Sequence, residues 1–206
     1  MTYTTDDQVL YSLRFAPPQL FGHYNGNFQV FGLFELLIEL KKSGIQNCRM
    51  LEIGSHMGES TALFAMSKLF TEIHCIEPFS GEEEFNDDNL CDWGFVENQF
   101  LLNTRHHTNI IHHKHFSQDI HEKFEDDFFD FIYIDADHSY ESVKSDLINY
   151  IPKIKDNGFV GGHDYKYPQS PERQPPFAGC VKAIDEVVGI PTKMFEDSSW
   201  IKRIQK

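Results

Sequence analysis

The chain has 206 residues, of which 40% are hydrophobic and 24% are charged. That composition suffices for one buried core and excludes a wholly disordered chain. Acidic residues number 32 against 18 basic ones, and the resulting net charge of -14 argues against nucleic acid and anionic membrane surfaces as partners.

Further features favour a cytoplasmic protein with a single domain over residues 1–206. The longest apolar stretch, Val30 to Leu40, is shorter than the ~20 residues that a membrane span requires, and it contains Glu35. Asp6 and Asp7 lie where a secretory signal would carry basic residues. The four cysteines form no CxxC pair, so we expect reduced thiols, mostly in the core.

Apolar patterns alternate along the chain between helical and strand-like periods. Helices are predicted over 28–42, 59–70, 140–153 and 179–188, and short strands over 49–53, 73–76, 109–113, 128–134 and 158–161. This alternation is typical of an α/β fold with a doubly wound, mostly parallel, Rossmann-like sheet and helices on both faces. Residues 192–195 and 199–204 predict an antiparallel C-terminal edge. Sites in such sheets lie at the carboxyl ends of the strands.

Two segments depart from this alternation. Residues 80–105 begin with a run of acidic side chains, and residues 165–177 contain four prolines, which suppress regular structure. Each segment is either a lid over a substrate or a solvated surface loop, and the sequence leaves both interpretations open.

The loop that joins strand 49–53 to the helix beginning at Glu59 is the most informative stretch. Gly54 can turn sharply at the strand end, and Gly58 lets the helix start close by. The free N–H groups at that helix N-terminus favour an anion such as a carboxylate. Glu77, after the next strand, can accept both hydroxyls of a ribose. We therefore expect a nucleoside-bearing cofactor. The spacing G-x-x-x-G in place of G-x-G-x-x-G disfavours NAD and FAD.

The pattern E-x-G-x-x-x-G from Glu52, followed by an acid about 25 residues later, resembles the class I S-adenosylmethionine-dependent methyltransferases. Within them it is similar to the catechol-O-methyltransferase-like group and to small O-methyltransferases that act on sugars. The resemblance covers roughly residues 48 to 164. It implies S-adenosylmethionine as the cofactor.

The resemblance also assigns roles to single residues. Glu52 would orient the amino-acid end of the cofactor, Ser60 would reach its carboxylate and Glu77 would hold its ribose. The turn Ser117-Gln118-Asp119 resembles the turn that meets adenine in the catechol enzyme. The residues that it implies for cofactor binding are Glu52, Gly54, Ser55, His56, Gly58, Ser60, Glu77, Ser117, Gln118 and Asp135. Two alternatives remain: the glycines only shape the helix approach, and His56 is only a surface histidine.

Two further runs end an apolar strand in acid or imidazole side chains. Asp135 follows one strand, and His163 and Asp164 follow the next. Neighbouring parallel strands would bring all three within reach of a divalent cation. The resemblance implies magnesium, since catechol-type enzymes carry an Asp and then an Asp-Asn pair at these places. His163 departs from that pattern, and a mixed nitrogen and oxygen set also suits manganese, iron or zinc. The alternative is that Asp135 and Asp164 serve as turn or N-cap residues.

Asp137 and His138 are the candidate catalytic residues. The predicted reaction is metal-assisted methyl transfer to the hydroxyl of a small molecule, a sugar or a phenol, in which one of them accepts the proton. The resemblance implies Asp137 by analogy with the sugar enzymes, whereas His138 stands at the position of the catechol enzyme's catalytic lysine. Either residue could instead cap the following helix.

Other interpretations stay open. A non-catalytic S-adenosylmethionine-binding or regulatory protein would need the glycine loop but neither Asp137 nor His138, and an NAD-linked oxidoreductase would need the missing glycine. His112, His113 and His115 favour a solvated strand edge over a metal site. A homo-oligomer is left open, because the Phe-rich residues 28–38 could pack in the core or against a second copy.

Overall fold

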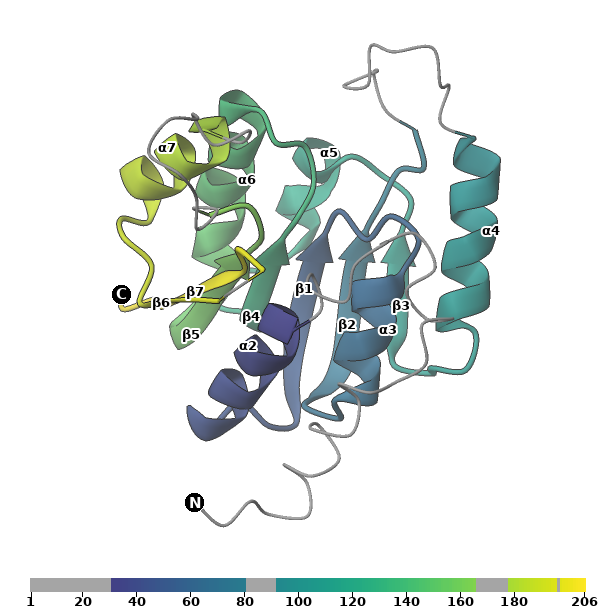
Figure 1. Cartoon of the computed structure of the whole chain (residues 1–206), viewed down its shortest axis with the longest axis horizontal. Helices are drawn as coiled ribbons and strands as arrows, with labels where there is room; N and C mark the ends of the chain where they lie inside the picture. The colour runs from purple at the N-terminus through teal and green to yellow at the C-terminus, as the bar shows by residue number, and fades with distance from the viewer. Residues whose placement is uncertain (1–30, 81–91, 166–177, 196) are drawn as a thin grey trace.

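A computed structural model describes residues 31–80, 92–165, 178–195 and 197–206 (Figure 1). Its seven-stranded sheet has the order β3-β2-β1-β4-β5-β7-β6. The strands are β1 (Cys48–Ile53), β2 (Phe70–Ile76), β3 (Ile110–His113), β4 (Phe129–Ile134), β5 (Ile154–Gly162), β6 (Lys193–Met194) and β7 (Trp200–Arg203). β1 to β5 pair in parallel, whereas β7 is antiparallel to both β5 and β6. The predicted fold class, including its antiparallel C-terminal edge, is confirmed.

Helices cover both faces of this sheet (Figure 1). One layer contains α2 (Phe31–Lys42), α3 (Glu59–Met66) and α4 (Trp93–Thr104); the other contains α5 (Ser117–Ile120), α6 (Tyr140–Tyr150) and α7 (Ala178–Val187). Two 3-10 turns, η2 (His121–Lys123) and η3 (Ile151–Lys153), complete the elements of the described ranges. Successive strand residues such as Met50 and Leu51 enter opposite cores, because side chains alternate across a strand.

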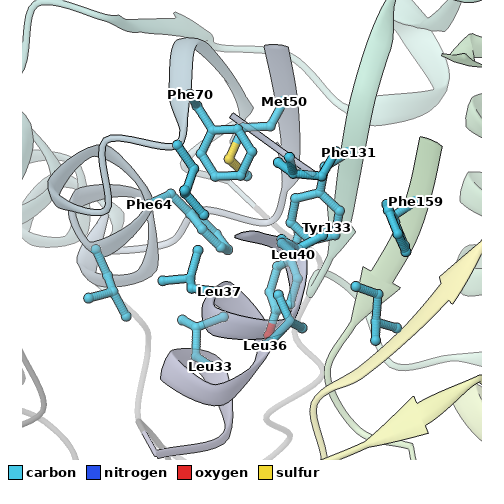
Figure 2. Close-up of a cluster of buried hydrophobic side chains, with 14 of the residues drawn as sticks. Leu33, Leu36, Leu37, Leu40, Met50, Phe64, Phe70, Phe131, Tyr133 and Phe159 are labelled. Carbon is cyan, nitrogen blue, oxygen red and sulfur yellow. The ribbon is translucent and has the colours of Figure 1, made fainter. Parts of the chain in front are cut away.

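The first core fixes α2 and α3 against the sheet. Figure 2 shows four leucines of α2 directed at Phe64 of α3 and at sheet residues that include Phe131 and Tyr133. The leucines are Leu33, Leu36, Leu37 and Leu40. Each fully buried leucine contributes about 1.5–3 kcal/mol through the apolar surface it removes from water. Burial of this layer holds the β1–α3 connection in one position.

Several element boundaries differ from the predictions. The helix that starts at Glu59 ends at Met66 rather than at residue 70, because Lys68 has a φ of 57° and cannot continue a right-handed helix. Phe70 is instead the first residue of β2, which is three residues longer than the predicted 73–76. β5 likewise begins at Ile154, because its first residue pairs with Phe129 of β4.

A buried aspartate attaches the C-terminal hairpin to the start of α2. Asp197 accepts hydrogen bonds from the backbone N–H of Leu33 at 2.8 Å and of Ser199 at 2.9 Å. Its carboxylate lies so close to Gly32 that a Cβ there would stand 1.7 Å from Oδ1. Glycine is therefore required at position 32.

Cysteine placement agrees with the sequence within the described residues. Cys75 and Cys180 are buried free thiols and Cys48 is partly buried, whereas Cys91 lies outside the described ranges. In the described part of the chain, no helix combines the length and the apolar character needed to cross a membrane.

A hydrogen-bonded histidine pair joins the edge strand β3 to β2. Nδ1 of His74 lies 2.9 Å from Nε2 of His113, and Nε2 of His74 lies 2.6 Å from Oε1 of Glu72. Nε2 of His112 lies 3.0 Å from the carbonyl oxygen of Glu77. β3 is the sheet edge as expected, and His112 and His113 are only partly solvated there, because each is partly buried against its neighbours. His115 is exposed.

We expect His113 to make the fold sensitive to acid. Burial, with repulsion from His74, lowers its pKa from 6.5 to about 4. The unfolded chain therefore binds a proton at a higher pH than the folded chain does, and this contribution to stability, full above pH 6.5, is lost as the pH falls toward 4. Because the ring is partly solvated, titration of His113 should change the free energy of unfolding by less than ~1.4 kcal/mol per pH unit.

Urea unfolding of the wild type and of His113→Gln across this pH range measures the contribution of His113 to the pH dependence of stability. Glutamine can donate to His74 but does not titrate. The difference in unfolding free energy between the two proteins should change with pH, and parallel curves would contradict the assignment. The difference between the two proteins is used because other groups titrate as well. The buried carboxyl of Glu52, whose pKa is raised, makes the fold more stable as the pH falls, which is opposite to the effect of His113.

Candidate functional site

The predicted site residues lie at the carboxyl ends of adjacent parallel strands. Gly54 follows β1, Glu77 follows β2, Asp135 follows β4 and His163 follows β5. The strands β2, β1, β4 and β5 are neighbours in this order, and the arrowheads of β1 and β2 end at the same edge in Figure 1. The arrangement is the one that the topology of an open α/β sheet predicts for a ligand site.

Both glycines of the β1–α3 loop are required by the backbone. Gly54 has a φ of 86°, and a Cβ on it would stand 2.1 Å from the carbonyl oxygen of Asp135. Gly58 has a φ of 76°, and a Cβ there would stand 2.8 Å from Cδ2 of Phe100. Both conformations are in the left-handed region that favours glycine. The glycines thus shape the helix approach and also bring the loop against the end of β4.

The N-terminus of α3 lacks a side-chain cap. Its N-cap residue is Gly58, which has no side chain to bond the first N–H groups of the helix. These groups, together with the helix dipole, favour an anion. The carboxylate of an amino acid, such as the one that S-adenosylmethionine carries, fits this end of the helix.

Glu52 lies beneath this loop and is fully buried. Its carboxylate accepts hydrogen bonds from the hydroxyls of Ser55 at 2.9 Å, of Ser60 and of Thr61. Burial raises the pKa of Glu52 to about 7, although the three hydroxyl donors act in the opposite direction. Glu52 and Ser60 therefore bind each other here, and their predicted contacts with the cofactor stay predictions.

Glu77 joins the loop to the end of β2. Its Oε2 accepts from the backbone N–H of His56 at 2.9 Å, and its Oε1 accepts from that of Phe79 at 3.0 Å. Burial raises its pKa. Each carboxylate oxygen has a second lone pair, so the predicted contact with ribose hydroxyls is chemically compatible with these bonds. The His56 ring is exposed, and its centroid lies 6.4 Å from that of Trp93.

Three residues at the ends of β4 and β5 form a compact donor group. Nε2 of His138 lies 2.9 Å from Oδ2 of Asp164 and 3.9 Å from Oδ1 of Asp135. Ligand atoms of Asp135, His138 and Asp164 all lie within 4.8 Å of one another. Atoms ~2.1 Å from a common cation stand at most ~4.2 Å apart, so the three donors would need only small side-chain adjustments to hold a divalent metal.

His163 has a different place from the predicted one. Its Nδ1 lies 3.1 Å from Oδ1 of Asp164, the oxygen opposite the one that His138 contacts. The structure thus brings Asp135 and Asp164 together as expected, with His138 as the third member of the group. His163 orients Asp164 from outside it.

The two histidines stabilise the charge of Asp164, whereas the two carboxylates of the group repel each other. Burial opposes ionisation of Asp164, but hydrogen bonds from His138 and His163 hold its pKa below the usual range. Burial disfavours the charged form of His163, but the hydrogen bond to Asp164 and the charge of Asp135 raise its pKa to about 9. Burial, and to a smaller degree the Asp164 carboxylate, raises the pKa of Asp135.

Asp137 takes part in the start of α6. Its carboxylate accepts from the Ser139 N–H at 2.7 Å and from the Ser142 hydroxyl at 2.6 Å. Ser139 is the N-cap and accepts from the Ser142 N–H at 3.3 Å. The helix-start role that the sequence left open for Asp137 is therefore present. Asp137 is also exposed, so its catalytic role stays a prediction.

A pocket opens beside the donor group. Its polar lining consists of Asp135, Asp137, His138, His163 and Asp164. Its apolar lining includes Val143 and Leu147 of α6 and Ile184 of α7. The candidate catalytic and metal-binding residues thus line one small concave surface.

The adenine turn and the proposed lids are only partly described. Gln118 is exposed at the start of α5, and the Ser117 hydroxyl donates to Asp146 at 2.6 Å. Within 80–105, residues 93–104 form α4, whereas 81–91 lie outside the described residues. Of 165–177, only Tyr165 is described. The lid interpretation of both segments stays a prediction.

Comparison with known proteins extends these observations. Residues 51–165 match a family model described as a methyltransferase domain. An uncharacterized protein of Sinorhizobium fredii, y4gI, is 28% identical over 122 residues, which are 56% of this chain and 13% of that protein. The chain thus corresponds to a small part of this longer relative.

Solved structures share the fold at low identity. An O-methyltransferase from Bacillus cereus in complex with SAH is 15% identical, with a TM-score of 0.57, and the match covers 100% of this chain and 93% of that one. A SAM-dependent methyltransferase from Aquifex aeolicus is 13% identical, with a TM-score of 0.57 and coverage of 97% and 98%. Fibrillarin from Aeropyrum pernix with natively bound S-adenosyl-L-methionine is 13% identical, with a TM-score of 0.56 and coverage of 82% and 74%.

The family match covers both the glycine loop and the ends of β4 and β5, and the structural matches extend over nearly the whole chain. The chain belongs to the methyltransferase-domain family, and its fold is that of solved S-adenosylmethionine-dependent methyltransferases.

Proposed function

We propose that the protein transfers the methyl group of S-adenosylmethionine to a hydroxyl of a small molecule, a sugar or a phenol, with the help of a divalent metal. One observation carries this proposal: the uncapped N-terminus of α3 and the carboxylate of Glu77 lie at the same sheet edge as Asp135, His138 and Asp164. A site for an amino-acid nucleoside is thereby adjacent to a group that can activate an acceptor.

The cofactor would be held along this edge. The N–H groups of the first turn of α3 would bind its carboxylate, Glu77 its ribose and the turn at Gln118 its adenine. When bound, S-adenosylmethionine supplies a methyl group on a sulfonium. Two structural relatives were solved with S-adenosyl-L-methionine or SAH bound, which supports this assignment.

The acceptor side requires placement and removal of one proton. As the C–O bond forms and the C–S bond breaks, the acceptor hydroxyl loses its proton, and the exposed carboxylate of Asp137 is the group we assign to receive it. Asp135, His138 and Asp164 would hold the metal, which lowers the pKa of a bound hydroxyl. Their mixed oxygen and nitrogen donors favour manganese, iron or zinc over magnesium.

Calorimetric titration with S-adenosylhomocysteine and with NAD tests the cofactor assignment. We expect S-adenosylhomocysteine to bind and NAD not to bind. Transfer of a radiolabelled methyl group from S-adenosylmethionine to a panel of catechols and sugars tests the acceptor class. Binding of NAD alone would reject the proposal, and binding without transfer to any hydroxyl would favour a non-catalytic binding protein.

A further inference from the structure

The residue at which α5 begins is held from α6 at two points. The Ser117 hydroxyl donates a hydrogen bond to Oδ1 of Asp146 at 2.6 Å, and the Ser117 carbonyl accepts one from the Tyr150 hydroxyl at 2.8 Å. Asp146 and Tyr150 stand one turn apart on the same face of α6. The side chain and the backbone of Ser117 are therefore both fixed by this helix.

Burial of the Asp146 carboxylate at this position costs free energy. Its side chain is 4% exposed, and it lies on a helix whose neighbouring buried residues include Val143 and Leu147. Burial raises its pKa to about 6 against the hydrogen bond from Ser117. An apolar side chain could be buried there without the loss of hydration that a carboxylate suffers. The buried carboxylate of Asp146 is thus better explained by the segment that it holds than by packing.

The segment that it holds presents Gln118. This residue follows Ser117 directly and is exposed. A carboxamide carries a donor and an acceptor side by side, which can pair with the amino group and a ring nitrogen of adenine. A displacement of about 1 Å is enough to spoil such paired contacts. The position of the Ser117 backbone would therefore control how well the Gln118 carboxamide can pair with adenine.

On the basis of the proposed function, we infer that Asp146 and Tyr150 are positioning residues: they hold the Ser117–Gln118 turn so that the Gln118 carboxamide selects adenine in the nucleoside cofactor. Neither residue contacts the cofactor in this assignment. Their effect passes through the hydrogen bonds to Ser117.

The test compares binding of S-adenosylhomocysteine with that of S-inosylhomocysteine, in which a carbonyl replaces the amino group of the base. We expect the wild type to prefer the adenine compound by on the order of tenfold or more, the discrimination typical of one bidentate base contact. Asp146→Ala should lose most of this preference, and Tyr150→Phe should lose part of it. Asp146→Asn should restore it, because the amide oxygen can still accept from Ser117.

Ser145→Ala serves as the matched control, because Ser145 lies on α6 but its hydroxyl accepts from Asn149 of the same helix. A merely structural role of Asp146 would change the melting temperature and leave the ratio of the two dissociation constants unchanged. An unchanged ratio in both Asp146→Ala and Tyr150→Phe, or no preference in the wild type, would overturn this inference alone. A wild type that binds neither compound would overturn the proposed function as well.

Discussion

Gly54→Ala is expected to abolish cofactor binding. The added Cβ would stand 2.1 Å from the carbonyl oxygen of Asp135 and 2.6 Å from Cα of Ala136, so the loop must move away from the end of β4. Alanine at a φ of 86° is also strained. Left-handed conformation and overpacking together should cost about 2–5 kcal/mol of stability. The dissociation constant for S-adenosylhomocysteine should rise at least ~100-fold, since the ligand groups are displaced together.

Gly44→Ala separates these two effects. Gly44 has a similar φ of 94°, but a Cβ on it would meet no atom within 4 Å. This control should lose only the ~1–2 kcal/mol of the left-handed conformation and should bind S-adenosylhomocysteine like the wild type. Calorimetric titration and urea unfolding of both variants measure the difference. Wild-type affinity in folded Gly54→Ala would show that the loop does not hold the cofactor.

Asp164→Asn is expected to weaken metal binding. Asp164 has a φ of 63°, which asparagine tolerates, so the backbone should keep its course. The substitution removes the negative charge that lies between His138 and His163 and leaves a neutral amide oxygen, a weaker donor, in the group that fits a cation. We expect affinity for Co²⁺, followed by its visible absorption, to fall by ~10–100-fold and methyl transfer to fall at least as far.

Asp119→Asn is a suitable control, because Asp119 is exposed at the start of α5 and stands outside the donor group. It should bind Co²⁺ like the wild type. His138→Ala and His163→Ala then distinguish a donor from an orienting residue: the first should change the absorption spectrum of bound Co²⁺, and the second should mainly weaken binding. Undiminished transfer in EDTA, with no spectral change on adding Co²⁺, would reject the metal and leave the cofactor assignment intact.

The sheet and the glycine loop could be predicted because their signals are local. The alternation of apolar runs specifies parallel strands with crossovers, and Gly54 and Gly58 mark where the chain must turn. The end of the helix from Glu59 could not be predicted in this way. It depends on the left-handed backbone of Lys68, for which the side chain gives no signal.

The membership of the donor group could be predicted only in part. Asp135 and Asp164 follow neighbouring strands, so topology alone brings them together. His138 joins them because Ser139 caps α6 and Asp137 accepts from Ser139 and Ser142, which sets the turn after β4. The contacts of Ser117 with Asp146 and of His74 with His113 join residues 29 and 39 positions apart, a separation that no local pattern encodes.

A crystal structure with S-adenosylhomocysteine would test the central claim most directly. The account predicts density for its carboxylate at the N-terminus of α3, for its ribose at Glu77 and for its adenine beside Gln118. Density elsewhere on the molecule, or none at a saturating concentration, would contradict it.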